Sequence, residues 1–508
     1  MKALLSVFRK EGIVELAKTL TKAGIDLVST GGTLREIASA GIEVAQVSEL
    51  TGFPELLDGR VKTLHPKVHA GILARRDSPE HMAELAGRAI ESIDVIVVNL
   101  YPFEDKLQDA SATLSDMLEN IDIGGPTLLR AAAKNFPSVV VLVDPQDYGW
   151  VAEHFVEGTL TQEQRRVLAA KAFQHVALYD TLITNWLSEP VSDDFRNEIT
   201  FAFRKSSDLR YGENPHQRAA LYTSVPFSSG VVGATQLHGK DLSFNNLLDA
   251  DAAWQAASDF PEETVAVVKH TNTCGIASHP DIAEAYRRAH AGDPTSAYGG
   301  IVAFNRPVTA AAAEAMRGVF YEVVIAPDFD EAALLTLQKR RGLRVLKMGS
   351  SHQVQGIGQS LRHIRGGVLL QDADHIHEDT SNWSVATLSK PNPTQFDDLV
   401  FAWRVAKHIK SNAIVLVKDK ALIGMGAGQP NRLISVHLAL KAAGDRAQGC
   451  VLASDAFFPF ADGVELAVNG GVKAVIQPGG SIRDSEVVDT ANSAGISMVT
   501  TGVRHFLH

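Results

Sequence analysis

Short runs of aliphatic and β-branched residues alternate with helical stretches along the first 150 residues, and this alternation constrains the fold more than any other feature. The expected strands are 3–8, 25–29, 94–99 and 138–143. The stretch Gly12 to Lys22 predicts a helix with one apolar face. Strands that alternate with helices form a parallel sheet, so the chain is expected to be α/β, with ligands at the carboxyl ends of the strands.

The chain is too long to be organised by a single core. It has 508 residues, whereas a domain typically has about 100 to 200. Residues from about 151 to 198 are largely helical, and we interpret them as a connector. Strands and helices then alternate again, and a segment at 347–360 that is rich in Gly, Ser and Gln divides this part into two comparable halves. The expected domains are therefore 1–198 and 199–508.

The composition excludes several classes of protein. The 45% hydrophobic and 21% charged fractions are those of an ordinary globular protein, and no run approaches the roughly 18 apolar residues of a membrane span. A net charge of -11 argues against a nucleic-acid partner, because such partners need a broadly basic surface. Neither a signal peptide nor a cysteine framework is recognisable. We expect a soluble, cytoplasmic protein without a membrane partner.

Two neighbouring motifs in the first domain favour a bound phosphate. The segment Ser29-Thr30-Gly31-Gly32-Thr33 follows a predicted strand and opens a helix, where small residues and free N–H groups suit an anion. An ordinary strand-to-helix turn with a threonine cap fits these residues equally well. The segment from Arg60 to Lys67 carries four potentially cationic side chains in eight positions and favours the phosphate interpretation.

Four further residues of the first domain form a set suited to acid–base chemistry. Tyr101 follows a predicted strand, Asp122 precedes the helix 127–135, and Lys134 stands near the end of that helix. Helix capping and the helix dipole explain Asp122 and Lys134 separately. Together with Lys62 and Tyr101, however, they supply two ammonium groups, a phenol and a carboxylate, which suit work on a neutral ring system.

In the second domain a buried strand leads directly into Lys269 and His270, followed by a polar turn. A lone histidine after a strand is more often structural, but the neighbouring lysine and the polar turn that follows make a general base reasonable. The loop 209–217 is dense in polar groups, which favours binding. Asn412 and Arg432 offer hydrogen-bond donors, and the aromatic residues of 457–460 either pack in the core or stack on a flat ring.

Taken together, these motifs resemble those of the bifunctional AICAR transformylase/IMP cyclohydrolase family. The resemblance covers essentially the whole chain and rests on RVKTLHPKVHAGILARR, NLYPF, IDIGGPTLLRAAAKN, LRYGENPHQ, VVKHTNTCG, GMGAGQPNR, SDAFFPFADG and RHFLH, in that order. It implies an N-terminal methylglyoxal-synthase-like cyclohydrolase domain and a C-terminal transformylase domain of two cytidine-deaminase-like halves. The implied reactions are formyl transfer from 10-formyltetrahydrofolate to AICAR, giving FAICAR, and dehydrative closure of FAICAR to IMP. A homodimer is also implied.

The resemblance assigns roles to individual residues. His270 is expected to take the proton of the attacking amine while Lys269 stabilises the developing charge. Lys62, Tyr101, Asp122 and Lys134 are expected to form the cyclohydrolase centre, with Lys134 as proton donor or acceptor. The other expected substrate-binding residues are Lys10, Thr30, Gly31, Gly32, Thr33, Arg60, Thr63, Asn99, Arg210, Tyr211, Gly299, Glu322, Asn412, Arg432 and Phe457. No metal is expected, because the chain has neither a His-x-Glu nor a Cys-x-x-Cys zinc motif.

The chain departs from the family pattern in two places. Phe8-Arg9-Lys10 stands where Ser-Asp-Lys is usual, so only Lys10 carries over. Thr273 replaces a proline after the Lys-His pair, for which we expect a looser turn and retained activity. Two other interpretations are a phosphate-sensing regulatory module for the first domain and a zinc nucleoside deaminase for the chain, the latter disfavoured by the missing ligands.

Overall fold

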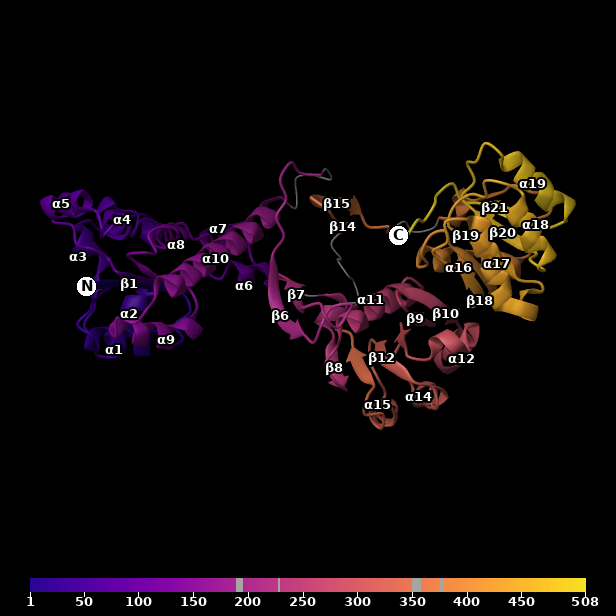
Figure 1. The fold of residues 1–508 in the computed structure, drawn as a ribbon, viewed down its shortest axis with the longest axis horizontal. Coiled ribbons are helices and arrows are strands. Elements are labelled where there is room, and N and C mark those ends of the chain that lie inside the picture. Colours follow the sequence, from indigo (N-terminus) through magenta and orange to yellow (C-terminus); the bar gives the residue numbers. More distant parts are fainter. Residues whose placement is uncertain (189–194, 227–228, 350–357, 375–378) are drawn as a thin grey trace. The chain divides into compact units, whose positions relative to one another are not determined.

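The computed structural model describes residues 1–188, 195–226, 229–349, 358–374 and 379–508. The chain forms two compact units (Figure 1), which are Met1–Arg204 with Tyr222–Phe227, and Lys205–Leu221 with Ser228–His508. The division after Arg204 lies close to the boundary expected at residue 198. The two units are described separately below.

Unit 1 contains a five-stranded sheet of order β3-β2-β1-β4-β5, in which every pair of neighbours is parallel. Its strands are β1 (Lys2–Val7), β2 (Asp26–Ser29), β3 (Ala45–Gln46), β4 (Val95–Asn99) and β5 (Val140–Leu142). Its helices are α1 (Ile13–Lys22), α2 (Gly31–Ser39), α3 (Val47–Thr51), α4 (Pro66–Leu73), α5 (Pro79–Gly87), α6 (Phe103–Leu107), α7 (Leu114–Glu119), α8 (Gly124–Lys134), α9 (Tyr148–Val156) and α10 (Gln162–Ser188), with short 3-10 turns η1 (Leu57–Gly59) and η2 (Pro145–Asp147). The predicted parallel sheet is confirmed.

The helices of unit 1 form because their apolar residues recur at helical spacing. On α1 the buried side chains are Ile13, Leu16, Ala17 and Leu20, which is the predicted face. The helix α10 packs against α8 and β5, and its Leu168, Ala172 and Val176 belong to the core of the sheet. This part of the predicted connector therefore packs into the core of unit 1. A long helix without Gly or Pro does not reveal from sequence which surface it covers.

Unit 2 is built on a twelve-stranded mixed sheet of order β16-β21-β20-β19-β17-β18-β10-β9-β11-β12-β13-β8. Its strands are β8 (Thr235–His238), β9 (Thr264–Lys269), β10 (Asn272–Ser278), β11 (Gly300–Phe304), β12 (Tyr321–Ala326), β13 (Arg344–Lys347), β16 (Ser384–Val385), β17 (Ile414–Lys418), β18 (Ala421–Gly426), β19 (Val451–Ser454), β20 (Ala474–Gln477) and β21 (Ser497–Thr500). Two separate antiparallel pairs are β6 (Phe203–Leu209) with β7 (Ala219–Ser224), and β14 (Gln359–Ile364) with β15 (Gly367–Asp372).

The helices of unit 2 are α11 (Phe244–Ser258), α12 (Ile282–Gly292), α13 (Pro294–Ala297), α14 (Ala310–Ala315), α15 (Glu331–Gln338), α16 (Pro393–Lys407), α17 (Arg432–Ala443), α18 (Asp462–Asn469) and α19 (Asp484–Ser493), with 3-10 turns η3 (Gly230–Gly233), η4 (Thr380–Asn382) and η5 (Gly444–Ala447). The helices α11 and α16 start at Ser243 and Asn392, whose side chains cap them in capping boxes. Local sequence thus sets where these two helices begin.

The two halves of unit 2 repeat one another. The succession α11-β9-β10-α12-β11-α14-β12-α15-β13 has the same order as α16-β17-β18-α17-β19-α18-β20-α19-β21. The strands β10 and β18 pair at the centre of the sheet, and equivalent strands follow outward on either side. The described part of unit 2 thus contains two comparable halves, and their division at 347–360 stays a prediction. Residues 350–357 of the expected dividing segment lie outside the described residues.

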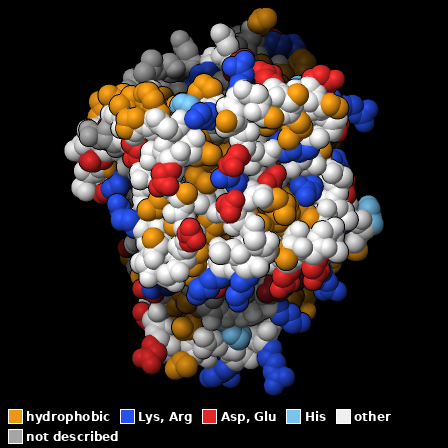
Figure 2. All heavy atoms as spheres, turned by 90° about the vertical axis from the view of Figure 1, so that its left-hand side faces the viewer, with side chains coloured by type: hydrophobic (Ala, Val, Ile, Leu, Met, Phe, Trp, Pro, Cys, Tyr) orange, Lys and Arg blue, Asp and Glu red, His pale blue; other side chains and the backbone are white. Residues whose placement is uncertain are grey.

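Within the described ranges, no helix is long and apolar enough to cross a membrane. Figure 2 shows one face of the molecule, on which blue Lys and Arg side chains are interspersed with red Asp and Glu side chains and with orange hydrophobic patches. On this face the charges of both signs are mixed, as the overall composition indicates.

Candidate active sites

The carboxyl ends of β1, β2 and β4 lie at one edge of the parallel sheet of unit 1. There the ammonium of Lys10 lies 3.3 Å from the hydroxyl of Thr33. Gly31 has a φ of +50°, and a Cβ placed on it would lie 4.0 Å from the ammonium of Lys62. Partial burial lowers the pKa of Lys10, and Lys62 and Arg35 lower it further, while Glu36 opposes them. This cationic corner beside the start of α2 suits an anion.

Asn99 holds the loop that presents Lys10. Its amide oxygen accepts hydrogen bonds from the backbone N–H groups of Phe8 and Arg9, at 2.6 and 2.9 Å, and its amide nitrogen donates to the carbonyl of Arg9 at 3.0 Å. Phe8 and Arg9 depart from the family pattern, but Asn99 contacts only their backbone groups. These contacts therefore do not depend on the two side chains. Both ends of the Asn99 side chain are engaged, which makes it a support of the loop in this structure.

Lys62, Tyr101 and Asp122 come together beside the start of α8. The ammonium of Lys62 lies 3.4 Å from the hydroxyl of Tyr101, and the carboxylate of Asp122 accepts from the N–H of Gly125 at 2.8 Å. Burial raises the pKa of Asp122, while the Gly125 N–H and the charge of Lys62 act in the opposite direction. A carboxyl group with a raised pKa beside a cation is suited to accepting a proton.

Tyr179 supports this cluster and was missed in the sequence. It lies on α10, and its hydroxyl accepts a hydrogen bond from the N–H of Asp122 at 2.8 Å and donates to the carbonyl of Asn120 at 2.7 Å. A single tyrosine inside a long helical pattern carries no signal of such a role. Only the packing of α10 against the start of α8 brings it here.

The remaining predicted residues of unit 1 lie around α8. Arg60 is exposed and forms an ion pair with Glu119 of α7, while Thr63 is buried next to Gly124. Lys134 is exposed in the last turn of α8. Lys134 is ten residues after Gly124, the first residue of α8, and ten residues of α-helix span about 15 Å. Lys134 therefore lies far from the first turn of α8 and from Asp122. The structure does not bring Lys134 to the other three members of the acid–base set.

The predicted residues of unit 2 gather along one edge of the large sheet. Lys269 and His270 lie at the turn from β9 to β10. The strands β11, β12 and β17 begin at this same edge, and β18 and β19 end there, because of the parallel or antiparallel direction of each pair. The residues brought there by these strand ends are Gly299, Glu322, Asn412, Arg432 and Phe457.

His270 is exposed and Lys269 is half-buried. The ammonium of Lys269 donates to the carbonyl of Tyr298 at 2.7 Å. His270 and Thr271 have φ angles of +54° and +58°. Thr273 is buried within β10, where it pairs with Val268. The position where the family has proline is thus part of the strand, and the looser turn expected from Thr273 stays a prediction.

Arg432 is the centre of a buried polar network. Its guanidinium donates to the hydroxyl of Ser454 at 2.8 Å and to the amide oxygen of Asn412 at 2.7 Å, and it pairs with Asp455. Asp455 has no exposed surface and also accepts from the hydroxyl of Ser411. These bonds fix the guanidinium in place. Asp455 was not selected from the sequence, although it stands inside the SDAFFPFADG motif.

The other predicted residues of unit 2 are half-buried or exposed. The guanidinium of Arg210 lies over the ring of Tyr211, 5.5 Å from its centroid. Glu322 accepts from Arg344 at 2.7 Å. Phe457 is 38% exposed, whereas Phe458 beside it is 1% exposed. Phe458 is therefore a core residue, and Phe457 offers a ring to a ligand.

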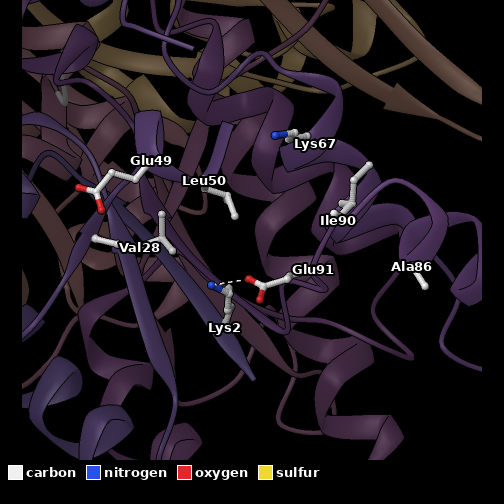
Figure 3. A pocket seen from close by; sticks show the side chains of 10 residues that line it. Lys2, Val28, Glu49, Leu50, Lys67, Ala86, Ile90 and Glu91 are labelled. Carbon is white, nitrogen blue, oxygen red and sulfur yellow. Dashed lines mark ion pairs between the residues drawn. The ribbon is translucent and has the colours of Figure 1, made fainter. Parts of the chain in front are cut away.

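A separate pocket of about 600 Å³ opens in unit 1 beside the amino end of β1 (Figure 3). Its lining includes Val28, Leu50, Lys67 and the ion pair between Lys2 and Glu91. None of its lining residues is a predicted site residue. In the part of the chain that the structure describes, no group of three or more His, Cys, Asp or Glu side chains is arranged to hold a metal.

Comparison with known proteins decides the family. A family model described as "AICARFT/IMPCHase bienzyme" matches residues 132–442, and a model described as "MGS-like domain" matches residues 12–127. The chain belongs to the AICARFT/IMPCHase bienzyme family. It is 49% identical over 508 residues to the bifunctional purine biosynthesis protein PurH of Thermoanaerobacter sp. (strain X514), covering 100% of this chain and 99% of the relative.

The bienzyme assignment extends to other relatives along their whole length. The protein of the same name from Dictyostelium discoideum is 48% identical over 543 residues, covering 100% of both chains. A solved structure titled "Crystal structure of ForH" is 37% identical and covers 37% of this chain and 98% of that chain, with a TM-score of 0.34. The predicted family, the MGS-like N-terminal domain and the two activities, AICAR transformylase and IMP cyclohydrolase, are confirmed. The chain is a bifunctional enzyme of purine biosynthesis that carries out the last two steps of IMP formation.

Proposed function

We propose that each unit contains one complete set of chemical groups, with formyl transfer in unit 2 and ring closure in unit 1. The observation that carries this proposal is that the predicted residues of each activity, with the exception of Lys134, collect at one sheet edge of one unit. AICAR, FAICAR and 10-formyltetrahydrofolate are the proposed small-molecule substrates. No metal takes part in the proposed steps.

In unit 2, His270 accepts the proton from the 5-amino group of AICAR as its nitrogen attacks the formyl carbon. The new C–N bond forms, the bond from the formyl carbon to the folate nitrogen breaks, and that nitrogen takes up a proton to give tetrahydrofolate. Lys269 stabilises the negative charge that develops on the formyl oxygen. Its ammonium, 2.7 Å from the carbonyl of Tyr298, is already oriented at this edge.

The substrate is held in this proposal by the fixed donors around the Lys-His turn. Arg432 supplies a guanidinium that Asp455 and Asn412 keep in place. Arg210 with Tyr211, Gly299 and Glu322 complete the AICAR site, and the exposed ring of Phe457 lies against the folate.

In unit 1 the phosphate and ribose of FAICAR are bound by the corner that contains Lys10, Thr30, Gly31, Gly32 and Thr33. Asp122 accepts a proton from the carboxamide nitrogen as this nitrogen attacks the formyl carbon, and passes the proton to the formyl oxygen, which becomes a hydroxyl. The C–O bond then breaks, the hydroxyl leaves as water with the proton of the formamide N–H, and the C=N bond of the ring forms. Lys62 and Tyr101, whose polar atoms lie 3.4 Å apart, stabilise the oxygen that leaves.

Lys134 enters this proposal from the family resemblance alone. If Lys134→Ala closes FAICAR at the native rate, Lys134 drops out and the cluster of Lys62, Tyr101 and Asp122 is sufficient. Thr63, Arg60 and Asn99 support the cluster and the phosphate corner. The cytoplasmic location and the absence of nucleic-acid and membrane partners stay predictions.

We also propose that the chain is a homodimer, as the resemblance implies. The antiparallel pair β14–β15 carries Leu361, Ile364, Val368 and Leu369, each at least 43% exposed. A lone two-stranded pair is at best marginally stable in water. A second copy of the chain would cover these side chains.

The test of the two-site proposal compares His270→Ala with Lys62→Ala. Each variant is supplied with AICAR and 10-formyltetrahydrofolate, and separately with FAICAR, while tetrahydrofolate and IMP are followed. Because a general base contributes about 10²- to 10⁴-fold, His270→Ala should lose at least that much formyl transfer and still close FAICAR. Lys62→Ala should show the opposite pattern.

Loss of both activities in either variant would contradict the two-site proposal, provided that circular dichroism shows a folded protein. Closure of FAICAR at the native rate by Lys62→Ala would instead remove Lys62 from the ring-closure site.

A further inference from the structure

The turn that carries His270 has a backbone conformation that its residues do not favour. His270 and Thr271 are consecutive residues with φ angles of +54° and +58°. Between the strand partners Lys269 and Asn272, such a two-residue turn normally selects Asn-Gly or Gly-Gly. A non-glycine residue is uncommon in the left-handed region, and the β-branched Thr271 is an outlier there, so something outside the turn must hold it.

Asp249 of α11 supplies this hold. One oxygen of its carboxylate accepts from the N–H of His270 at 3.2 Å, and the other accepts from the N–H of Thr271 at 2.7 Å. The carbonyl of His270 in turn accepts from the hydroxyl of Thr271 at 2.7 Å and from the amide of Asn272 at 3.0 Å. The backbone N–H and the carbonyl of His270 thus both have hydrogen-bond partners.

The second half of unit 2 contains the same arrangement. Asp419 and Lys420 have φ angles of +52° and lie between β17 and β18. The carboxylate of Asp398, on α16, accepts from the N–H of Asp419 at 3.0 Å and from the N–H of Lys420 at 2.7 Å. The elements α11 and α16 occupy equivalent places in the two halves, so the aspartate belongs to the architecture of the repeat.

The two turns differ in what their side chains contact. His270 is exposed at the edge where the predicted site residues gather. The second turn lies at the opposite edge, near Ser278 at the end of β10. There Lys420 lies 3.4 Å from Glu262, and the carbonyl of Asp419 accepts from Arg288 at 3.4 Å. The first turn leaves the His270 side chain exposed, where it can face a ligand. The second turn instead bonds to other parts of the protein through Lys420 and the carbonyl of Asp419.

We propose that Asp249 is a positioning residue of formyl transfer, which sets the direction of the His270 imidazole by holding the left-handed turn. This inference rests on the proposed role of His270. Asp249 makes its contacts with the backbone and not with the substrate, so it acts through His270. A displacement of a catalytic group by about 1 Å lowers a rate by about 10²-fold.

The test is Asp249→Asn in the full-length enzyme, with Asp398→Asn as the matched control. Asparagine keeps one acceptor oxygen and turns an N–H donor toward the second backbone N–H. We expect the kcat of formyl transfer to fall by about 10- to 100-fold in Asp249→Asn, with the KM for AICAR changed less than about threefold. Asp398→Asn should lower the melting temperature similarly but keep the native kcat.

A rescue variant separates positioning from general damage. Glycine adopts positive φ without steric strain, so Thr271→Gly added to Asp249→Asn should recover at least tenfold of the lost kcat. If Asp249→Asn does not fold, Asp249→Glu is assayed instead, since it keeps both oxygens but moves them by one methylene.

An unchanged kcat in Asp249→Asn, or an equal loss in Asp398→Asn, would overturn the inference. His270→Ala, assayed in parallel, keeps the two proposals apart. If His270→Ala is inactive while Asp249→Asn is fully active, only the positioning role fails. If His270→Ala is active, the catalytic assignment itself fails.

Discussion

Several polar residues of the two sites act on the protein rather than directly on a ligand. Asn99 holds the loop before Lys10, Tyr179 holds Asn120 and Asp122, and Asp455 holds Arg432. Each of these side chains satisfies buried or half-buried hydrogen-bonding groups that would otherwise be unpaired. A sequence motif identifies such residues as part of a site, but their hydrogen-bond partners decide what they do.

Asp122 leads to a prediction at the residue scale. Burial raises the pKa of its carboxyl group, so folding shifts this group toward the protonated form relative to the unfolded chain. Its contribution to stability is therefore full below the unfolded pKa and is lost as the pH rises through the folded value. Asp122→Asn, which imitates the neutral form, should stop ring closure and raise the melting temperature of unit 1 at pH 8 by about 2 °C.

The measurement is calorimetry of the native protein and of Asp122→Asn from pH 8 downward. The pH dependence of FAICAR closure is measured for the native enzyme. The gain in melting temperature should shrink as the pH falls toward the raised pKa of Asp122. The acid limb of closure in the native enzyme should lie above 3.8, the ordinary value for aspartate. A lower melting temperature for Asp122→Asn at pH 8 would show that the ionised form is stabilising.

At the scale of elements, glycines explain how closely helices approach the central strands. In the sequence, Gly424-Met425-Gly426-Ala427-Gly428 is rich in glycine but lacks the spacing of the G-x-G-x-x-G nucleotide fingerprint. In the structure, a Cβ on Gly424 would lie 2.3 Å from the carbonyl of Ala439, and one on Gly426 would lie 2.1 Å from the carbonyl of Ser435, both in α17. Gly275 of β10 meets α12 in the same way, 2.0 Å from the carbonyl of Ala289. These three glycines serve packing in both halves.

Gly426→Ala is therefore expected to destabilise unit 2. The contacting atom is a backbone oxygen, so the helix itself must move, and overpacking of this kind costs about 1 to 3 kcal/mol. Gly342→Ala is the control, since nothing lies within 4 Å of its Cβ position. Urea denaturation followed by fluorescence should show a lower midpoint for Gly426→Ala alone. Equal midpoints for the two variants would mean that α17 yields without strain.

At the scale of the whole molecule, the chain has separate cores for its two activities. One hydrophobic cluster runs from Ala3 to Ala202 in unit 1, and three others lie within 231–499 in unit 2. The sequence expectation of two domains follows from length and alternation. The twelve-stranded sheet of unit 2, however, depends on the pairing of β10 with β18, which joins residues 144 positions apart at Ala277 and Ala421.

The proposed homodimer is tested with the β14–β15 pair. Leu361 and Val368 lie on the same face of this pair. Val368 is opposite His363, and His363 is two residues after Leu361 on the same strand, so its side chain points to the same side. Changing both to lysine should dissociate the dimer in sedimentation velocity, because burying two ammonium groups is unfavourable. The control is Ile482→Lys, an exposed aliphatic residue outside the pair. A native protein that sediments as a 54.6 kDa monomer would contradict the proposal.

The sequence by itself determined the fold class, the presence of two domains, the two halves of the second and the family. These properties depend on the periodicity of apolar residues and on long contiguous motifs, both of which can be recognised from the order of residues alone. The tertiary structure decided that α10 belongs to the core of unit 1, that Lys134 stands at the far end of α8, and that Asp249 holds the His270 turn. Each of these depends on which distant elements pack together, and packing brings together residues whose own sequence neighbourhoods look ordinary.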